Sequence, residues 1–178
     1  MMKKIAGLLL IVSTFASARV ELIVPGSLSA NFVHSMSGNG VIARYSGKAL
    51  VNKSRAFRLE YRRPNRQLAC NYKSDVYWID YGSHAAVRYR VGSLLDVMQI
   101  LKVARPYRGN YYKSNYHGYH FLLHVNNKGQ VDRITFKDKK GINNTITLSN
   151  IHYTKRPLPA SRFSCPVPRG YRIIQGKI

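Results

Sequence analysis

The sequence predicts a mainly β fold with one or two short helices. Three observations support this class. Short runs of alternating apolar and polar residues recur along the chain, turn residues separate them, and only residues 94–104 show a long helical pattern. Short connections join strands that run antiparallel. We therefore expect one strongly curved antiparallel sheet, an incomplete barrel, with a helical lid over its apolar concave face.

The densest β pattern lies in residues 55–81. Phe57, Leu59 and Tyr61 alternate there with charged residues, which is the period of two of a half-buried strand. Pro64 ends this first run, because proline cannot donate a hydrogen bond to a neighbouring strand. A sheet with such an apolar face needs either a cover or a ligand.

Two further strand patterns complete this stretch, at residues 67–72 and 76–81, and the second is rich in the aromatic residues that sheets favour. In the second run both alternating sets of side chains are apolar. The sequence therefore leaves open which set faces inward. The two sets are Tyr77 with Ile79, and Val76 with Trp78.

Residues 1–18 have the three parts of a secretory signal peptide. Two lysines come first, an apolar run follows at residues 5–12, and a small residue, Ala18, ends the segment. The apolar run is shorter than the roughly 20 residues that a membrane-spanning helix needs. We expect cleavage after Ala18, export to the periplasm, and a single domain over residues 19–178.

The next strands are predicted at residues 27–36 and 41–53, joined by a tight turn rich in glycine. Residues 19–24, which precede them, form an apolar piece too short to be a stable helix. Gly47 lies inside the second strand and predicts a bulge or bend where the sheet curls.

The helical pattern covers residues 94–104, and Ser93 is a suitable N-cap. Polar residues recur every third position, so most of the circumference is apolar and only a narrow stripe is polar. An ordinary core helix is the commonest cause of such a pattern. If one helix packs on the concave face of a curved sheet, that helix is both part of the core and the lid over the apolar face. We expect it to hinge at Gly92 and at Arg105 and Pro106.

The rest of the chain predicts a meander with short hairpin turns. A proline-rich loop over residues 154–160 leads into a last strand that prolines interrupt. These strands are predicted at residues 110–116, 118–125, 131–137, 145–153 and 161–174.

The sequence offers no constellation typical of an enzyme or a metal centre. His120 and His124 share one face of a predicted strand but lie about 13 Å apart, too far to hold one ion together with His117. Only seven carboxylates occur, and no nucleophile elbow, phosphate loop or zinc-protease motif is found. We expect no catalytic residue, metal or cofactor.

Cys70 and Cys165 are the two cysteines of the chain. An even number in an oxidising compartment permits a disulfide but does not require one. Each cysteine also lies in a strand-like run, where a free cysteine behaves as a small buried hydrophobe. Both states stay open.

The chain is strongly basic, with 29 Lys and Arg against 7 Asp and Glu and a formal charge of +22. Export would remove nucleic acid as a partner. Anionic membrane surfaces remain, since they attract nearby basic residues by about 1 kcal/mol each. A lineage with a basic proteome is the alternative explanation, and the scatter of the basic residues along the sequence favours it.

Five short segments match, in order and spacing, the motifs of a known family. They correspond to an F-x-A-x-F segment, a glycine-started strand, an F-x-W strand ending in proline, a hairpin, and a closing segment with proline and glycine. On these motifs the chain resembles the LolA-type family of periplasmic outer-membrane lipoprotein carriers, over nearly the whole mature length. The matching residues are Leu28, Ala30, Phe32, residues 47–54, Phe57, Leu59, Pro64, residues 68–79, Phe163, Pro168 and Gly170.

The chain departs from the family pattern at three places. One is the hairpin turn, where residues 72–74 replace the family's Asp-Gly without changing the strands. The family usually has a longer N-terminal helix as part of its lid, where this chain has the short piece 19–24. The family also has an arginine followed by proline as a lid latch, where this chain has Lys53 and Ser54. Lysine keeps the charge but lacks the planar five-donor group of arginine, so Lys53 is either a weakened latch or a solvated residue at a strand end.

The resemblance implies a non-enzymatic, monomeric carrier that shields the acyl chains of lipoproteins and transfers them from the inner to the outer membrane. Its implied partners are an inner-membrane ATP-driven lipoprotein-releasing complex and an outer-membrane receptor lipoprotein or the outer membrane itself. Alternatives are a basic lipid- or membrane-surface-binding protein and a sensor domain of the same fold. The residues expected to bind acyl chains are Phe57, Leu59, Tyr61, Leu68, Tyr77, Ile79, Leu94, Leu95, Met98 and Leu101.

Overall fold

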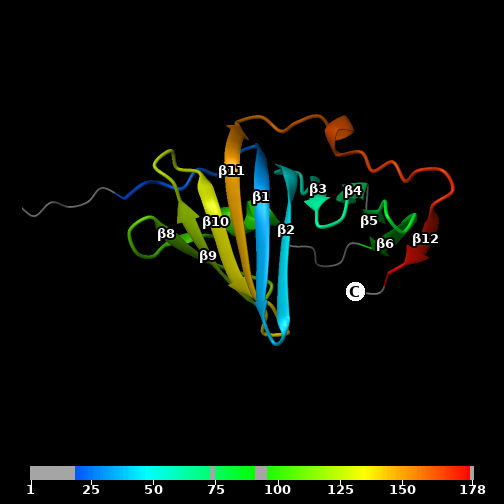
Figure 1. Ribbon diagram of the computed structural model, residues 1–178. Helices are drawn as coiled ribbons and strands as arrows, with labels where there is room; N and C mark the ends of the chain where they lie inside the picture. Colours follow the sequence, from blue (N-terminus) through cyan, green and yellow to red (C-terminus); the bar gives the residue numbers. More distant parts are fainter. Residues whose placement is uncertain (1–18, 73–74, 91–95, 177–178) are drawn as a thin grey trace, which may run out of the picture.

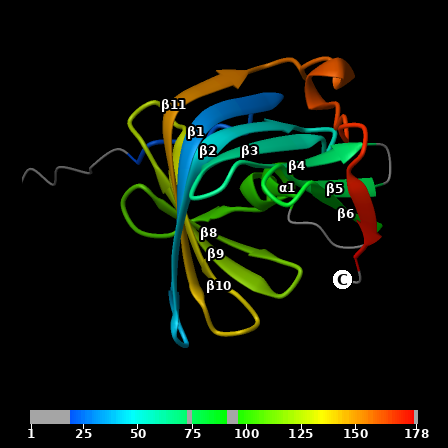
Figure 2. The ribbon, with the colours of Figure 1, turned by 45° about the vertical axis from the view of Figure 1, so that its right-hand side comes forward.

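The computed structural model describes residues 19–72, 75–90 and 96–176, which form one curved, open sheet of twelve strands with a short helix inside the curve (Figures 1 and 2). The mainly β prediction is confirmed. The strands are β1 (Ser27–Gly38), β2 (Val41–Asn52), β3 (Phe57–Arg63), β4 (Gln67–Tyr72), β5 (Asp75–Asp80), β6 (Ala85–Arg90), β7 (Arg105–Pro106), β8 (Tyr111–Tyr116), β9 (Tyr119–Val125), β10 (Val131–Lys137), β11 (Asn143–Thr154) and β12 (Arg172–Gln175).

The strand order across the sheet is β12-β6-β5-β4-β3-β2-β1-β11-β10-β9-β8-β7. All neighbouring strands pair antiparallel except β12, which pairs parallel with β6. The pairing of β1 with β11 joins the two hairpin series into one sheet. The three longest strands, β1, β2 and β11, lie at its centre.

The predicted irregularity at Gly47 is confirmed. The pairing of β2 with β3 shifts register between Ser46 and Gly47, and a Cβ on Gly47 would overlap the backbone carbonyl of Glu60. Only glycine lets the β3 backbone come so close. A second register shift interrupts the pairing of β1 with β11 between Ser29 and Asn31. Irregularities of this kind bend strands and allow the sheet to curl.

Helix α1 (Val97–Lys102) is shorter than predicted. Its N-cap is Asp96, whose side chain accepts a hydrogen bond from the backbone N–H of Gln99. The predicted cap Ser93 and hinge Gly92 lie outside the described residues. Arg105 and Pro106, predicted as the second hinge, instead form β7 and pair with β8. No helix in the described residues has the length and apolar character needed to cross a membrane.

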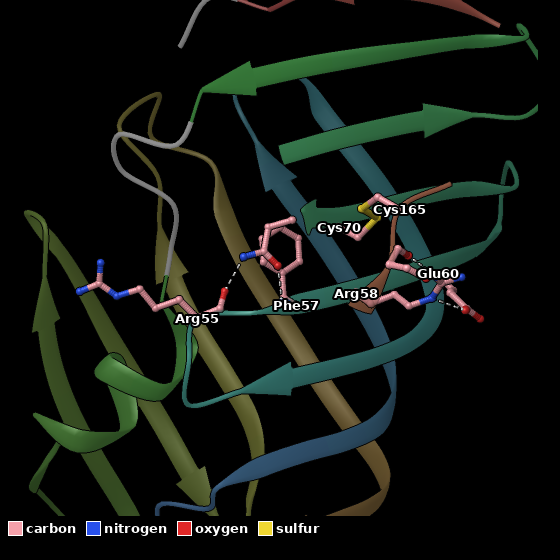
Figure 3. Close-up of a disulfide and its surroundings, with 8 residues drawn as sticks. Arg55, Phe57, Arg58, Glu60, Cys70 and Cys165 are labelled. Atoms are coloured by element: carbon pink, nitrogen blue, oxygen red, sulfur yellow. Dashed lines mark hydrogen bonds and ion pairs between the residues drawn. A yellow bond between two sulfur atoms is a disulfide. The ribbon is translucent and has the colours of Figure 1, made fainter. Parts of the chain in front are cut away.

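The prediction of a last strand over residues 161–174 is wrong for most of its length. A 3-10 turn, η1 (Ala160–Phe163), is followed by irregular chain, and only β12 is a strand. The prolines explain this, because they cannot donate to a sheet ladder. The segment is attached by a disulfide between Cys70 and Cys165, whose Cα atoms are 5.9 Å apart (Figure 3).

Residues 19–26 form no regular element, as their shortness predicted, but they are fixed to the sheet. The Tyr112 hydroxyl donates to the carbonyl of Val20 at 2.7 Å and accepts from the backbone N–H of Leu22 at 3.1 Å. The side chains of Val20 and Leu22 pack against the main core. This segment therefore adds apolar cover to the core.

Candidate functional site

The concave face of the sheet and the buried side of α1 form one large apolar cluster, which we call the trough. Met98, Ile100 and Leu101 of the helix are buried in it. The sheet contributes side chains from both sides of its centre, from β5 across to β8. Its buried sheet residues are Leu28, Ala30, Phe32, Ala49, Val51, Tyr61, Ala69, Tyr112, Phe121, Leu123, Val125, Val131, Ile134 and Leu148.

Five of the ten residues predicted to bind acyl chains lie in the trough. Phe57, Leu59 and Tyr61 of β3 face it. Met98 and Leu101 of α1 belong to the same cluster on the helix side. The alternation in β3 and the apolar surface of the helix were sufficient to place these side chains. Two other predicted residues, Leu94 and Leu95, lie outside the described residues.

The remaining three predicted residues, Leu68, Tyr77 and Ile79, are on the opposite face of the sheet, and their assignment to the trough is corrected. Leu68 and Ile79 form a second cluster with Cys70 and Ala86, and Tyr77 packs against it. The C-terminal segment covers this cluster with Cys165, Val167 and Tyr171. Both faces of β4 and β5 are therefore buried. This is why the sequence pattern did not show which side chains face the trough.

Trp78 is the aromatic side chain of β5 that faces the trough. Its ring lies 5.2 Å from that of Tyr61, and Tyr61 in turn meets Phe32 edge to face at 5.2 Å. Pairing of Leu59 with Ala69 and of Ala69 with Trp78 places these side chains on one face. The structure thus selects Trp78 between the two sets left open by the sequence.

A cavity of about 110 Å³ lies between α1 and the sheet. Leu59, Ala49 and Val131 line it from the sheet, and Val97 and Leu101 line it from the helix. An apolar cavity of about 150 Å³ accommodates a benzene-sized molecule, whereas pockets for larger ligands have about 300 to 1,000 Å³. The closed trough therefore has room for a small apolar group but not for a long acyl chain.

Polar groups lie at one margin of this cavity. His34 Nε2 is 2.8 Å from Asn144 Oδ1, and the His34 ring lies 6.1 Å from that of Tyr45. Burial, together with the neighbouring Tyr45, raises the pKa of Tyr61 to about 12. The Tyr61 phenol therefore stays protonated near neutral pH.

Among the described residues, two polar side-chain contacts join α1 and its cap to the rest of the fold. Arg55 Nε lies 3.2 Å from Asp96 Oδ2, and the Ser114 hydroxyl donates to the carbonyl of Ile100 at 2.8 Å. Lys53, the predicted latch, makes no side-chain hydrogen bond or ion pair with any residue that the structure describes. The arginine that reaches the helix is thus Arg55, two positions further along the chain, and no sequence signal distinguished it from the other basic residues.

The convex face has a larger hollow, of about 520 Å³, with charged walls. Lys48, Arg58, Glu60 and Arg162 line it, and Arg58 is paired with Glu60 at 2.9 Å. Its walls suit water better than acyl chains. Within residues 19–72, 75–90 and 96–176, no group of three or more His, Cys, Asp or Glu side chains could hold a metal ion.

No family model matches the chain. The outer-membrane lipoprotein carrier protein of Helicobacter hepaticus is 22% identical over 150 residues, which cover 84% of this chain and 83% of that protein. The resemblance to the LolA-type family is confirmed.

Two solved structures are also similar to the chain. An uncharacterized conserved protein from Thermus thermophilus aligns over 86% of this chain and 92% of its own, with 12% identity and a TM-score of 0.53, which shows a shared fold. A LolA superfamily protein from Nitrosomonas europaea covers 82% of this chain and 93% of its own, with 13% identity and a TM-score of 0.46.

Proposed function

We propose that this protein is a periplasmic carrier that shields the acyl chains of lipoproteins in its trough and transfers them from the inner to the outer membrane. The observation that best supports the proposal is the apolar concave face covered by a single short helix, with a cavity between the two. The similarity to a lipoprotein carrier supports an acyl chain as the ligand of this apolar surface. No covalent chemistry is needed.

In this proposal α1 is the lid and leaves the trough when an acyl chain enters. The cavity of about 110 Å³ requires this movement, because it is smaller than the pockets that hold larger ligands. A helix of six residues has little stability of its own and depends on its packing. The ion pair with Arg55 is a weak fastening, since exposed pairs contribute about 0–1 kcal/mol.

The energies of lid and ligand are comparable. Exposing the three buried side chains of α1 would cost about 1.5–3 kcal/mol each, or roughly 5–9 kcal/mol together. Burying ten methylene groups of an acyl chain returns about 8 kcal/mol at about 0.8 kcal/mol each. Burial of one acyl chain would therefore offset most or all of the cost of displacing the helix, and reclosure of the helix would assist release.

The residues proposed to contact acyl chains are revised from the sequence prediction. Phe57, Leu59, Tyr61, Met98 and Leu101 keep this role, and Trp78 and the cavity wall join them. Residues 1–18 are proposed as the cleaved export signal. Loading from an inner-membrane ATP-driven complex, and unloading to a receptor lipoprotein or to the outer membrane itself, are proposed on the basis of the relationship alone.

Release of a radiolabelled lipoprotein from inner-membrane vesicles tests this function. Ala49→Leu adds three carbons to the wall of the cavity and Leu59→Glu adds a carboxylate, so each should lower release about tenfold or more. Ile173→Glu changes an apolar residue that is already 53% exposed on β12 and should release like the wild type.

Circular dichroism melts must show that each variant is folded. Ala49→Leu is the safer of the two, because it places apolar carbons in an apolar cavity. If both trough variants were folded and released lipoprotein as the wild type does, the assignment of the trough would be wrong.

A further inference from the structure

Two turns form a single tip at one end of the central strands. The turn between β1 and β2 and the turn between β10 and β11 lie side by side at the lower end of the sheet in both views (Figures 1 and 2). The Asn39 side-chain amide donates to the backbone carbonyl of Lys140 and joins them. We call the following residues the basic tip: Val41, Ile42, Arg44, Lys137, Lys139 and Lys140.

Ile42 is the most exposed large apolar side chain in the part of the chain that the structure describes. It is 93% exposed, and the next, Ile173, is 53% exposed. It contributes almost nothing to the core. A single exposed apolar residue is common on protein surfaces and does not by itself indicate a binding site. The neighbouring side chains must supply further evidence.

The surroundings of Ile42 are cationic. Across the sheet Ile42 pairs with Ser37, Ser37 with Asn143, and Asn143 with Lys137, so Ile42 and Lys137 share one face. Arg44 lies two residues along β2 on that same face, and Lys139 and Lys140 follow in the adjoining turn. All four of these basic residues are exposed.

Asp138 is the one carboxylate among residues 36–44 and 136–144, and it is hydrogen-bonded to the backbone of its own turn. Asp138 Oδ1 accepts hydrogen bonds from the backbone N–H groups of Lys140 at 2.8 Å and Ile142 at 2.9 Å. It forms no ion pair with the described residues. The tip therefore combines four cations, one internally bound carboxylate and one protruding apolar side chain.

We propose that the basic tip docks on an anionic phospholipid bilayer. Ile42 enters the headgroup region, and the basic side chains lie against the lipid phosphates. Apolar insertion combined with basic residues is the arrangement by which proteins bind reversibly to membrane surfaces. A fluid bilayer accepts an isolated isoleucine without a matching pocket, which a protein partner would have to supply.

Docking by the tip goes beyond the carrier function and does not depend on it. The strand β1 that ends at the tip also contributes Phe32 to the trough. A docked molecule therefore holds its trough near the membrane. Charge scattered over the whole surface would give no such orientation.

Co-sedimentation of the mature protein with vesicles tests the proposal. Vesicles of phosphatidylglycerol with phosphatidylethanolamine should bind the wild type, and neutral phosphatidylcholine vesicles should bind far less. Lys139→Gln with Lys140→Gln should weaken binding about 25-fold, at about fivefold per charge. Ile42→Ser should weaken it about tenfold or more.

Two matched controls use residues away from the tip. Lys155→Gln with Arg156→Gln removes two exposed charges just past the opposite end of β11, and Ile173→Ser removes an exposed isoleucine on β12. Both should bind within about twofold of the wild type. Equal losses in the control and tip charge variants would show a diffuse charge effect, and unchanged binding by Ile42→Ser would exclude insertion; either result would overturn the proposal.

Lipoprotein binding in solution separates this proposal from the carrier function. The tip variants should form the complex with a lipoprotein as the wild type does, because none of the changed residues belongs to the trough. If wild-type protein bound anionic vesicles through the tip but formed no lipoprotein complex, the carrier function would fail and the docking proposal would stand.

Discussion

The disulfide between Cys70 and Cys165 closes a loop with a sequence separation of 95 residues, and its removal should destabilise the fold strongly. The chain-entropy model gives about 4.7 kcal/mol for a loop of about 100 residues. In domains of this size each kcal/mol corresponds to about 2–4 °C in Tm. Replacing both cysteines with alanine should therefore lower Tm by about 10–19 °C.

Thermal melts followed by circular dichroism measure this change. Reduction of the wild type should reproduce the shift, whereas the double alanine variant should not respond to reductant. Trp78 is the sole tryptophan and lies in the trough, on the other face of the sheet, so its fluorescence in the folded variant should match the wild type. A fall in Tm of less than about 3 °C would refute the conclusion that the disulfide stabilises the fold strongly.

Two further predictions concern the alkaline range and the lid. Because burial raises the pKa of Tyr61 from 10.0 to about 12, the native state keeps a proton that the unfolded chain loses. This stabilisation is complete below pH 10 and is lost as the pH rises to 12, which lowers the free energy of unfolding by about 2–3 kcal/mol. Urea unfolding at about pH 10 and about pH 12 should show this decrease. The decrease should be smaller in Tyr61→Phe. At Asp96, alanine removes both the cap and the ion pair with Arg55, whereas asparagine keeps a cap. Asp96→Ala should speed amide exchange in α1 about fivefold more than Asp96→Asn, and equal rates would show that the cap does not hold the lid.

The strands could be predicted from the sequence because their apolar residues alternate on one covered face. Leu59 and Tyr61 are the clearest case, and the structure places both in the trough. The same reasoning failed at Leu68 and Ile79, because the C-terminal segment covers the second face of β4 and β5. Alternation of apolar and polar residues shows which face of a strand is covered. When both faces are covered, both sets of side chains are apolar, and the sequence does not show which set faces the trough.

The ends of α1 and the course of the C-terminal segment were beyond sequence reasoning for a different reason. Ser93 and Asp96 are both good N-caps, and tertiary contacts with Arg55 and Ser114 accompany the choice of Asp96. The position of the C-terminal segment is fixed by the disulfide between Cys165 and Cys70, and not by strand pairing at that point. Such contacts join residues far apart in sequence, and local pattern carries no signal for them.

The most direct test of the carrier function is native mass spectrometry of the mature protein, purified from cells that coexpress a tagged outer-membrane lipoprotein. We expect a one-to-one complex that is lost when the lipoprotein lacks its acylated cysteine, and that Ala49→Leu weakens without unfolding the carrier. Free carrier alone, with the lipoprotein left in the inner membrane, would contradict the proposal and reduce the relationship with the LolA-type carriers to one of fold.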